Sequence, residues 1–262
     1  MNVRFCFSAE QLKNIALVSM VIDHAAVGLI EQSELASGVA WSLCGTAMRL
    51  MGRVAFPLFA FMIAEGAVHT RDRRRYALRL LLLAVISEIP FDLVAGGTWL
   101  FPADQNTVFT LLLGLLAVWA GDLICGTGSG VSYGNREKTG DGGRKAVGQR
   151  RFPLEYERYI RVLAAVPFGL AAYCLKTDYG FMGVLLIVIL YTLRTEPQLR
   201  TAVCAVFLFC MYMDFYGAAA CVAIFLINRY NGEKGSGSGR IFYLFYPLHL
   251  LVIRGIKMAV GL

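Results

Sequence analysis

Charged residues are scarce in this sequence. Asp, Glu, Lys and Arg make up 16% of its 262 residues, whereas ordinary soluble domains are about 25% charged. Hydrophobic residues account for 57%, and the mean hydropathy is +0.59. Long apolar runs recur from end to end, and in lipid only helices or closed barrels satisfy the backbone. Because the runs are continuous rather than alternating, the sequence predicts an all-α integral membrane protein, a polytopic bundle of about nine transmembrane helices.

Motifs for metals and nucleotides are missing as well. None of the seven Cys forms a C-x-x-C pair, and most lie in apolar runs, where Cys behaves as a small hydrophobe. We therefore expect neither a disulfide framework nor a metal site. The net charge of +7 would favour nucleic acid in a soluble protein. Here Lys and Arg cluster between apolar runs, as in cytoplasmic loops, so we expect no nucleic-acid partner.

The apolar runs define the expected helices. Ser8 and Gln11 fit a capping box that starts the first one, and "GVAWSLCGTAMRL" at 38–50 is expected at the membrane interface. The Gly-rich, charged stretch 127–158 predicts a flexible cytoplasmic loop. In one membrane domain it separates a first helical half (1–126), which carries the polar residues, from a second (159–262). The expected spans are 12–30, 54–69, 75–95, 107–126, 159–175, 180–194, 200–213, 216–228 and 240–259.

Basic residues between the spans predict the orientation. Lys and Arg gather in 71–79, 127–158, 194–200 and 229–240, and cytoplasmic loops carry such an excess. Nine spans and a cytoplasmic N-terminus place all four segments on the cytoplasmic side, in contact with membrane lipids. The segment 31–53 then faces outward, although it contains two Arg.

Ionisable residues at membrane depth usually face the bundle interior and mark a functional path. The first helix places Asp23 and His24 well inside an apolar run, with His24 roughly 18 Å from its inner end at 1.5 Å per residue. The same depth estimate puts further polar residues of other helices into the outer half. They are Arg49, Arg53, Glu88, Asp92 and Asn106, while His249 of the last helix is expected near mid-depth.

Helical geometry separates the first pair. Neighbouring residues point about 100° apart, so Asp23 is expected to pair with Arg49, Arg53 or His249, leaving His24 to face a cavity. The alternative is structural: an Asp–Arg and Glu–Arg network that only holds helices together. At the inner end, Arg71, Arg73, Arg74 and Arg75 suit the phosphates of a nucleotide-like cofactor; their alternative is contact with lipid headgroups.

Several stretches together resemble the TraX family of membrane proteins. They are "LKNIALVSMVIDH", "MRLMGRVAFPLFAFMIAEGAVHT", "YALRLLLLAVISEIPFDL", "QNTVFTLLLGLLA", "DYGFMGVLLI" and "FYPLHLLVI". The family takes its name from a conjugation protein that N-acetylates the amino-terminal residue of pilin. The resemblance implies a multi-pass acetyltransferase of the bacterial plasma membrane that moves acetyl from cytoplasmic acetyl-CoA to an amine or hydroxyl acceptor, a small molecule or a peptide, at the outer side.

With that chemistry, His24 is the expected general base or acetyl carrier. Asp23 and Glu88 would hold charged groups in place, and Arg53 or Asn106 would stabilise the oxyanion. The catalytic candidates are His24, Asp23 and Arg53, with cofactor phosphates at Arg71, Arg73, Arg74 and Arg75. The substrate-binding candidates are Glu88, Asp92, Asn106, Arg49 and His249.

Three other functions fit the residues alone. An ion-coupled transporter would use Asp23, Glu88 and His24 as a proton path. A non-enzymatic assembly protein would use the polar cluster only as structure. A haem protein would use His24 and His249 as axial ligands.

Overall fold

A computed structural model describes residues 6–33, 37–127, 151–235 and 239–261, and within these ranges the regular structure is helical, with two isolated β-bridges. The predicted all-α class is confirmed. The elements are α1 (Ala9–Ala25), the π-helical η1 (Ala26–Glu31), α2 (Val39–Gly52), α3 (Ala55–His69), α4 (Arg73–Ala95), α5 (Thr107–Cys125), α6 (Leu154–Cys174), α7 (Gly180–Thr192), α8 (Pro197–Tyr212), α9 (Phe215–Ala220), α10 (Val222–Ile227) and α11 (Gly239–Val260).

The predicted count of nine transmembrane helices is not confirmed. Four segments of the described chain are long and apolar enough to cross a membrane: Ala9–Glu31, Val39–His69, Thr107–Cys125 and Tyr243–Val260. The helix α7 is apolar but has only 13 residues, about 20 Å at 1.5 Å per residue, and is shorter than a hydrocarbon core of about 30 Å.

Two expected segments differ in form. The stretch 38–50, expected at the membrane interface, belongs to the helix α2, which packs on α1 and η1 and joins α3 through a turn at Arg53. Its Ser, Thr and Gly residues lower its apolar character, yet Gly45 allows close approach to Ile30. The span 216–228 is divided at Cys221 into α9 and α10.

Local sequence signals explain where helices begin. Ser8 accepts a hydrogen bond from the Gln11 amide, and the Gln11 side chain accepts one from the Ser8 amide, so the predicted capping box is present. Asp72 caps α4 by accepting from the Arg75 amide, and Asn106 caps α5 by accepting from the Val108 amide. Such caps satisfy amides that a helix leaves unpaired in its first turn.

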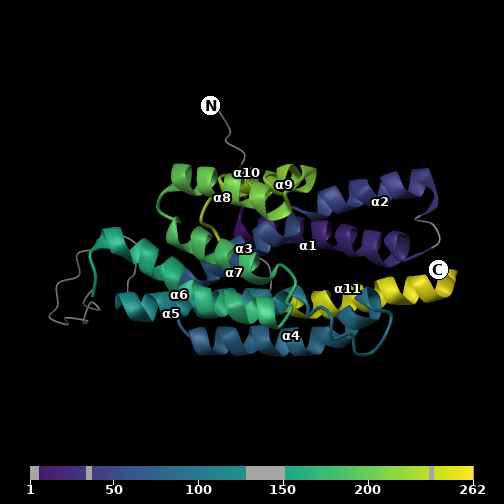
Figure 1. Ribbon diagram of the computed structural model, residues 1–262, viewed down its shortest axis with the longest axis horizontal. Coiled ribbons are helices and arrows are strands. Elements are labelled where there is room, and N and C mark those ends of the chain that lie inside the picture. The colour runs from purple at the N-terminus through teal and green to yellow at the C-terminus, as the bar shows by residue number, and fades with distance from the viewer. Residues whose placement is uncertain (1–5, 34–36, 128–150, 236–238, 262) are drawn as a thin grey trace.

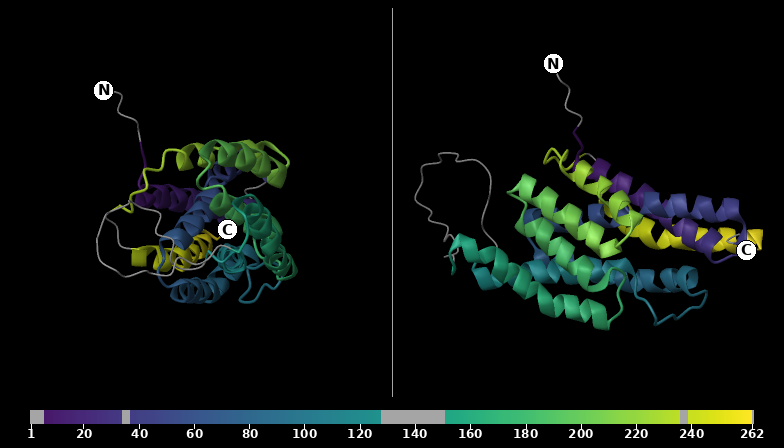
Figure 2. Two further views of the ribbon diagram at one scale, coloured as in Figure 1. Left: turned by 90° about the vertical axis from the view of Figure 1, so that its left-hand side faces the viewer. Right: turned by 45° about the horizontal axis from the view of Figure 1, so that its top comes forward.

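The helices form an elongated bundle (Figure 1). The helix α5 packs on α4, α6 and α7, while α3 packs on α1, α5 and α7. The last helix, α11, lies along α4 and also contacts α1 and η1 (Figures 1 and 2). This interleaving brings α1, α5, α7 and α11 together although they are distant in sequence. Most of the loop predicted at 127–158 lies outside the described residues.

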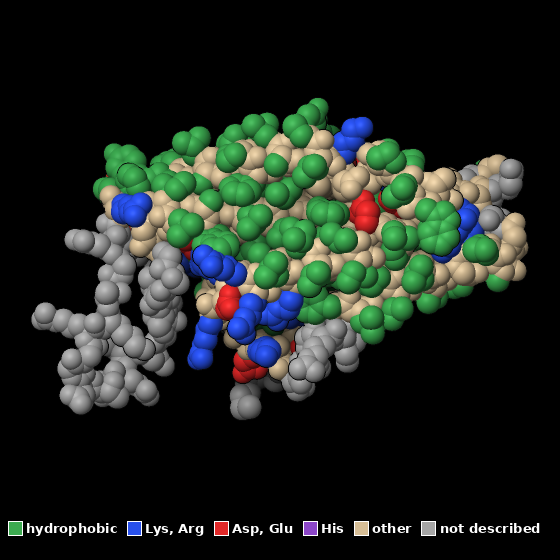
Figure 3. Space-filling view, turned by 90° about the horizontal axis from the view of Figure 1, so that it is seen from below, with side chains coloured by type: hydrophobic (Ala, Val, Ile, Leu, Met, Phe, Trp, Pro, Cys, Tyr) green, Lys and Arg blue, Asp and Glu red, His purple; other side chains and the backbone are tan. Residues whose placement is uncertain are grey.

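Charged contacts gather the basic segments at one end of the bundle. Arg73 at the start of α4 pairs with Asp122 near the end of α5, and Arg158 in α6 pairs with Glu196 before α8. Phe7 forms a β-bridge with Tyr230. The four basic segments are 71–79, 127–158, 194–200 and 229–240, and Figure 1 shows their described parts on the left. Figure 3 shows Lys and Arg side chains gathered on the same half of an otherwise largely apolar face. We name this the basic end.

Candidate functional site

Asp23 lies between two arginines. Its carboxylate oxygens are 2.6 Å from Arg49 Nη1 and 2.8 Å from Arg53 Nη2. The Asp23 and Arg53 side chains are only 13% and 12% exposed. Arg49 also pairs with Glu31 at 3.3 Å, and Arg53 lies over the rings of two tyrosines of α8 and α9. Asp23 therefore has partners on another helix, as the 100° separation predicted.

Close packing makes this ion-pair network possible. A Cβ atom added at Gly52 would overlap the Asp23 carboxyl group. Any larger residue at this position would push α2 away from α1. Gly52 thus brings both arginines, at the end of α2 and the turn after it, within reach of one carboxylate.

His24, which is half-buried, and the buried His249 bind each other rather than Asp23. His24 Nδ1 is 2.7 Å from His249 Nε2, and His249 Nδ1 is 3.1 Å from the Phe245 carbonyl oxygen. A carbonyl can only accept, so His249 Nδ1 carries its proton. In the neutral pair, His249 Nε2 accepts from His24 Nδ1. The hydrogen-bond chain leaves His24 Nε2 unprotonated, the form that a general base requires.

His24 lines a small cavity of about 60 Å³. By the usual measure of about 10–15 Å³ for one water, it has room for about four water molecules. Met20, Phe56 and Phe59 supply apolar wall. The polar residues of the lining come from α1, the start of α5, the loop before α7, and α11: Asp23, His24, Thr107, Asp178, Tyr179 and Tyr246.

The loop between α6 and α7 places Asp178 in this lining. Its backbone pairs with the residue before the α5 cap: the Gln105 amide donates to the Lys176 carbonyl, and the Asp178 amide donates to the Gln105 carbonyl, each at 2.9 Å. The Thr107 hydroxyl donates to the Asp178 carboxylate.

Tyr179, at the end of this loop, adopts the left-handed conformation with φ +64°, and its ring stacks on Phe56 with centroids 3.7 Å apart. Backbone strain of this kind persists where surrounding contacts enforce it, frequently at functional sites.

Three predicted substrate-binding residues, Glu88, Asp92 and Asn106, are absent from the cavity lining. Asn106 donates to Glu88 and to the Ala84 carbonyl, which ties α4 to the start of α5. Asp92 accepts from the Phe101 amide at 3.0 Å and holds the loop between the same helices. These contacts position Thr107 and are structural in kind.

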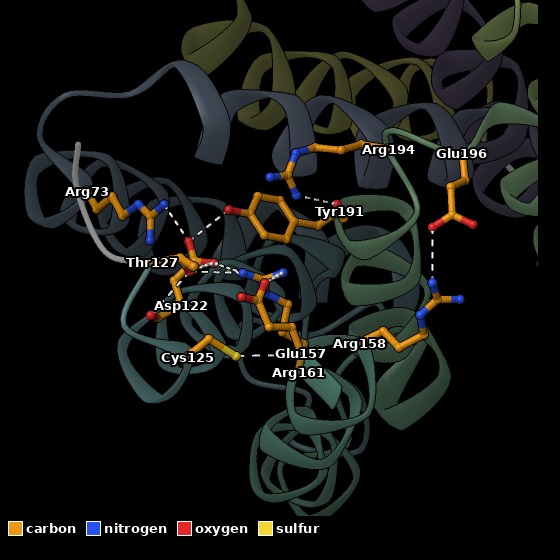
Figure 4. A network of polar contacts seen from close by, with 10 residues as sticks. All are labelled: Arg73, Asp122, Cys125, Thr127, Glu157, Arg158, Arg161, Tyr191, Arg194 and Glu196. Carbon is orange, nitrogen blue, oxygen red and sulfur yellow. Dashed lines mark hydrogen bonds and ion pairs between the residues drawn. The ribbon is translucent and has the colours of Figure 1, made fainter. Parts of the chain in front are cut away.

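The predicted phosphate-binding arginines do not act as one group. Arg73 turns inward to Asp122, which is 1% exposed and also accepts from Arg161, Tyr191 and Thr127 (Figure 4). This network joins α4, α5, α6 and α7. The other three, Arg71, Arg74 and Arg75, are exposed, and Arg75 pairs with Asp72 at 3.0 Å. Within the described ranges no group of three or more His, Cys, Asp or Glu residues is arranged to hold a metal.

Sequence reasoning missed Thr107, Asp178, Tyr179 and Tyr246. Hydroxyl and phenol side chains in apolar runs are common and carry no signal of their own. Asp178 was the one detectable residue, since it is an acid in a very short connection between apolar helices. All four lie in stretches quoted above for their family resemblance.

Comparison with known proteins agrees with that resemblance. The model of the TraX protein family matches residues 8–127 and 151–257. The chain is also similar to the probable fimbrial assembly protein FimC, serogroup H1, of Dichelobacter nodosus, with 26% identity over 276 residues that cover 96% of each chain. No solved structure matches it. Because the family model spans most of the chain, including the whole cavity lining, this protein belongs to the TraX family.

Proposed function

We propose that this protein is a membrane acetyltransferase that uses acetyl-CoA as acetyl donor and acetylates an amine or hydroxyl within the bundle. The observation that carries the proposal is the hydrogen-bond chain from the Phe245 carbonyl through His249 to His24. It presents an unprotonated ring nitrogen on a residue that lines a small cavity. The family and its fimbrial assembly relative support a role in pilin modification or assembly, with a pilin-like acceptor.

The residues support a direct transfer. His24 Nε2 removes the proton from the acceptor nitrogen or oxygen, whose lone pair attacks the thioester carbonyl carbon. The carbonyl π electrons move to oxygen. When they return, the carbon–sulfur bond breaks and the thiolate of CoA takes the proton held by His24. His249 keeps its proton on Nδ1 throughout and stabilises the transient imidazolium through Nε2.

A covalent route would use the same atom as nucleophile. His24 Nε2 would attack the thioester, CoA would leave, and the acetyl-histidine would then pass acetyl to the acceptor. Ping-pong kinetics would favour this route, whereas a ternary-complex pattern favours direct transfer.

The basic end is the proposed cytoplasmic side, where the donor binds. Exposed arginines at the start of α4, Arg71, Arg74 and Arg75, would contact its phosphates. His24 lies 15 residues after the first residue of α1, about 22 Å along the axis. The pantetheine arm would cover that length, and the acceptor would enter from the opposite side. Membrane lipids surround the apolar faces.

The test compares all three histidines in protein purified and reconstituted in liposomes. Transfer from labelled acetyl-CoA, or its hydrolysis, should be lost in His24→Ala and strongly reduced in His249→Ala. His69→Ala is the matched control, because that ring is exposed and pairs with Glu65 at the basic end. Full activity of a folded His24→Ala protein would exclude the catalytic role.

The His24–His249 pair also favours a second candidate, an ion-coupled transporter, because two hydrogen-bonded rings within a membrane can relay a proton. Proton flux in liposomes without acetyl-CoA, lost in His24→Ala, would support that function. A folded His24→Ala protein that has lost acetyl transfer but still supports fimbrial assembly in cells would instead indicate an assembly role.

A further inference from the structure

Acetyl transfer requires a donor for the carbonyl oxygen that becomes negative as the acceptor attacks. The two residues expected to supply it, Arg53 and Asn106, are absent from the cavity lining. Arg53 donates to Asp23 and to the Arg49 carbonyl. The Asn106 amide donates to Glu88 and Ala84. These structural contacts use both amide hydrogens of Asn106 and hold the Arg53 guanidinium against Asp23.

Tyr246 is placed differently. It lines the cavity and is only 7% exposed. Its hydroxyl is buried and makes no hydrogen bond of ordinary geometry in the described part of the chain. A buried hydroxyl that makes no hydrogen bond costs about 1–3 kcal/mol. Native proteins therefore seldom keep one without a ligand or a functional reason.

The surroundings of this hydroxyl match the chemistry. Tyr246 precedes His249 by three residues on α11, so both project from one face of the helix. Its ring centroid lies 6.3 Å from that of His24 and 5.5 Å from that of His249. Thr107, in the first turn of α5, directs its amide and hydroxyl toward the Tyr246 oxygen as donors, but outside ordinary hydrogen-bond geometry, and neither contact gives the Tyr246 proton an acceptor. The positive end of that helix dipole therefore faces the same region.

The geometry points to Tyr246 as a catalytic residue whose hydroxyl donates a hydrogen bond to the thioester carbonyl oxygen as negative charge develops there. This assignment rests on the proposed acetyl transfer. The hydroxyl keeps its proton, so it adds no step to the electron and proton balance given above. It binds the oxygen more strongly in the transition state than in the ground state, and therefore acts on kcat.

The test is Tyr246→Phe, which keeps the ring and removes one oxygen. We expect kcat to fall by about 10²–10³-fold, the range found when one oxyanion donor is removed, with little change in KM for acetyl-CoA. Tyr243→Phe is the matched control: the same substitution one turn earlier on α11, outside the cavity lining. It should leave kcat and KM unchanged.

Thermal unfolding supplies a readout that needs no activity. If the Tyr246 hydroxyl has no partner in the resting protein, Tyr246→Phe unfolds at the same temperature as the wild type or higher. A clear loss of stability, or an unchanged kcat, overturns the inference. A rise in KM alone does so too, since it indicates ground-state binding. If the wild type neither transfers nor hydrolyses acetyl-CoA, the proposed function itself fails and the role of Tyr246 fails with it.

Discussion

Neutralising Asp23 should destabilise the fold strongly. Asp23→Asn keeps the side-chain shape but leaves two guanidinium groups without their carboxylate. At 2.6 and 2.8 Å and an effective dielectric constant of about 20, each attraction amounts to about 6 kcal/mol before desolvation is subtracted. Removing one partner from a buried ion pair costs about 3–5 kcal/mol net. Asp23 and Arg53 are almost fully enclosed, so we expect a value in this range.

The measurement is thermal unfolding in detergent followed by circular dichroism. At about 2–4 °C per kcal/mol for chains of this size, the unfolding temperature should fall by about 6–20 °C. The control removes the charges together: Asp23→Ala with Arg49→Met and Arg53→Met should recover most of the loss. The charge that loses its partner in this variant, Glu31, is 45% exposed and can be solvated. The reasoning is refuted if Asp23→Asn unfolds at the wild-type temperature, or if the triple variant is less stable than the single one.

Three further predictions concern stability and use the same measurement. Gly52→Ala should cost about 1–3 kcal/mol by overpacking against Asp23. Its control is Gly255→Ala, where an added Cβ meets nothing, and which should be neutral or stabilising. Equal changes in unfolding temperature for the two variants would contradict the close packing of α2 on α1. Asp122→Asn should cost about 3–5 kcal/mol, because Arg73 and Arg161 lose their shared carboxylate and Arg161 is left with the longer ion pair to Glu157 at 3.6 Å. A loss no larger than that of an exposed ion pair would show that the network is solvated. Met213→Gly should stabilise by about 1 kcal/mol, because Met213 ends α8 at φ +57° in a conformation that suits glycine; a loss of stability would show that its side chain contributes to packing.

Periodicity and charge were sufficient for the fold class and for the partners of Asp23. Apolar runs dictate helices in lipid, and Arg49 and Arg53 share one helical face because they are four residues apart. The depth estimated from the position of each residue along its helix placed both arginines level with Asp23. The number of transmembrane helices could not be predicted from the apolar runs in the same way. Length and hydropathy do not distinguish a crossing helix from a shorter apolar helix packed inside the bundle, such as α7.

The site was only partly predictable for a different reason. His24 was identified because a histidine within an apolar helix is conspicuous. Its actual partner is His249, and that pairing depends on how α11 passes between α1 and α4. Thr107 and Tyr246 carry no charge, so their importance arises from position alone. Position depends on the backbone pairing of Gln105 with the loop before α7, which no local pattern encodes.

The His24–His249 bond also sets an order of events during synthesis. Its two residues are 225 positions apart, so at about 5–20 residues per second the ribosome needs roughly 10–45 s to add the second after the first. Until α11 enters the bundle, His24 has no ring to fix its tautomer, and the cavity lacks Tyr246. A nascent or truncated chain that lacks α11 can therefore hold most of its helices in the membrane and still lack part of the proposed site. The proposed site is complete only when this last helix has joined the bundle.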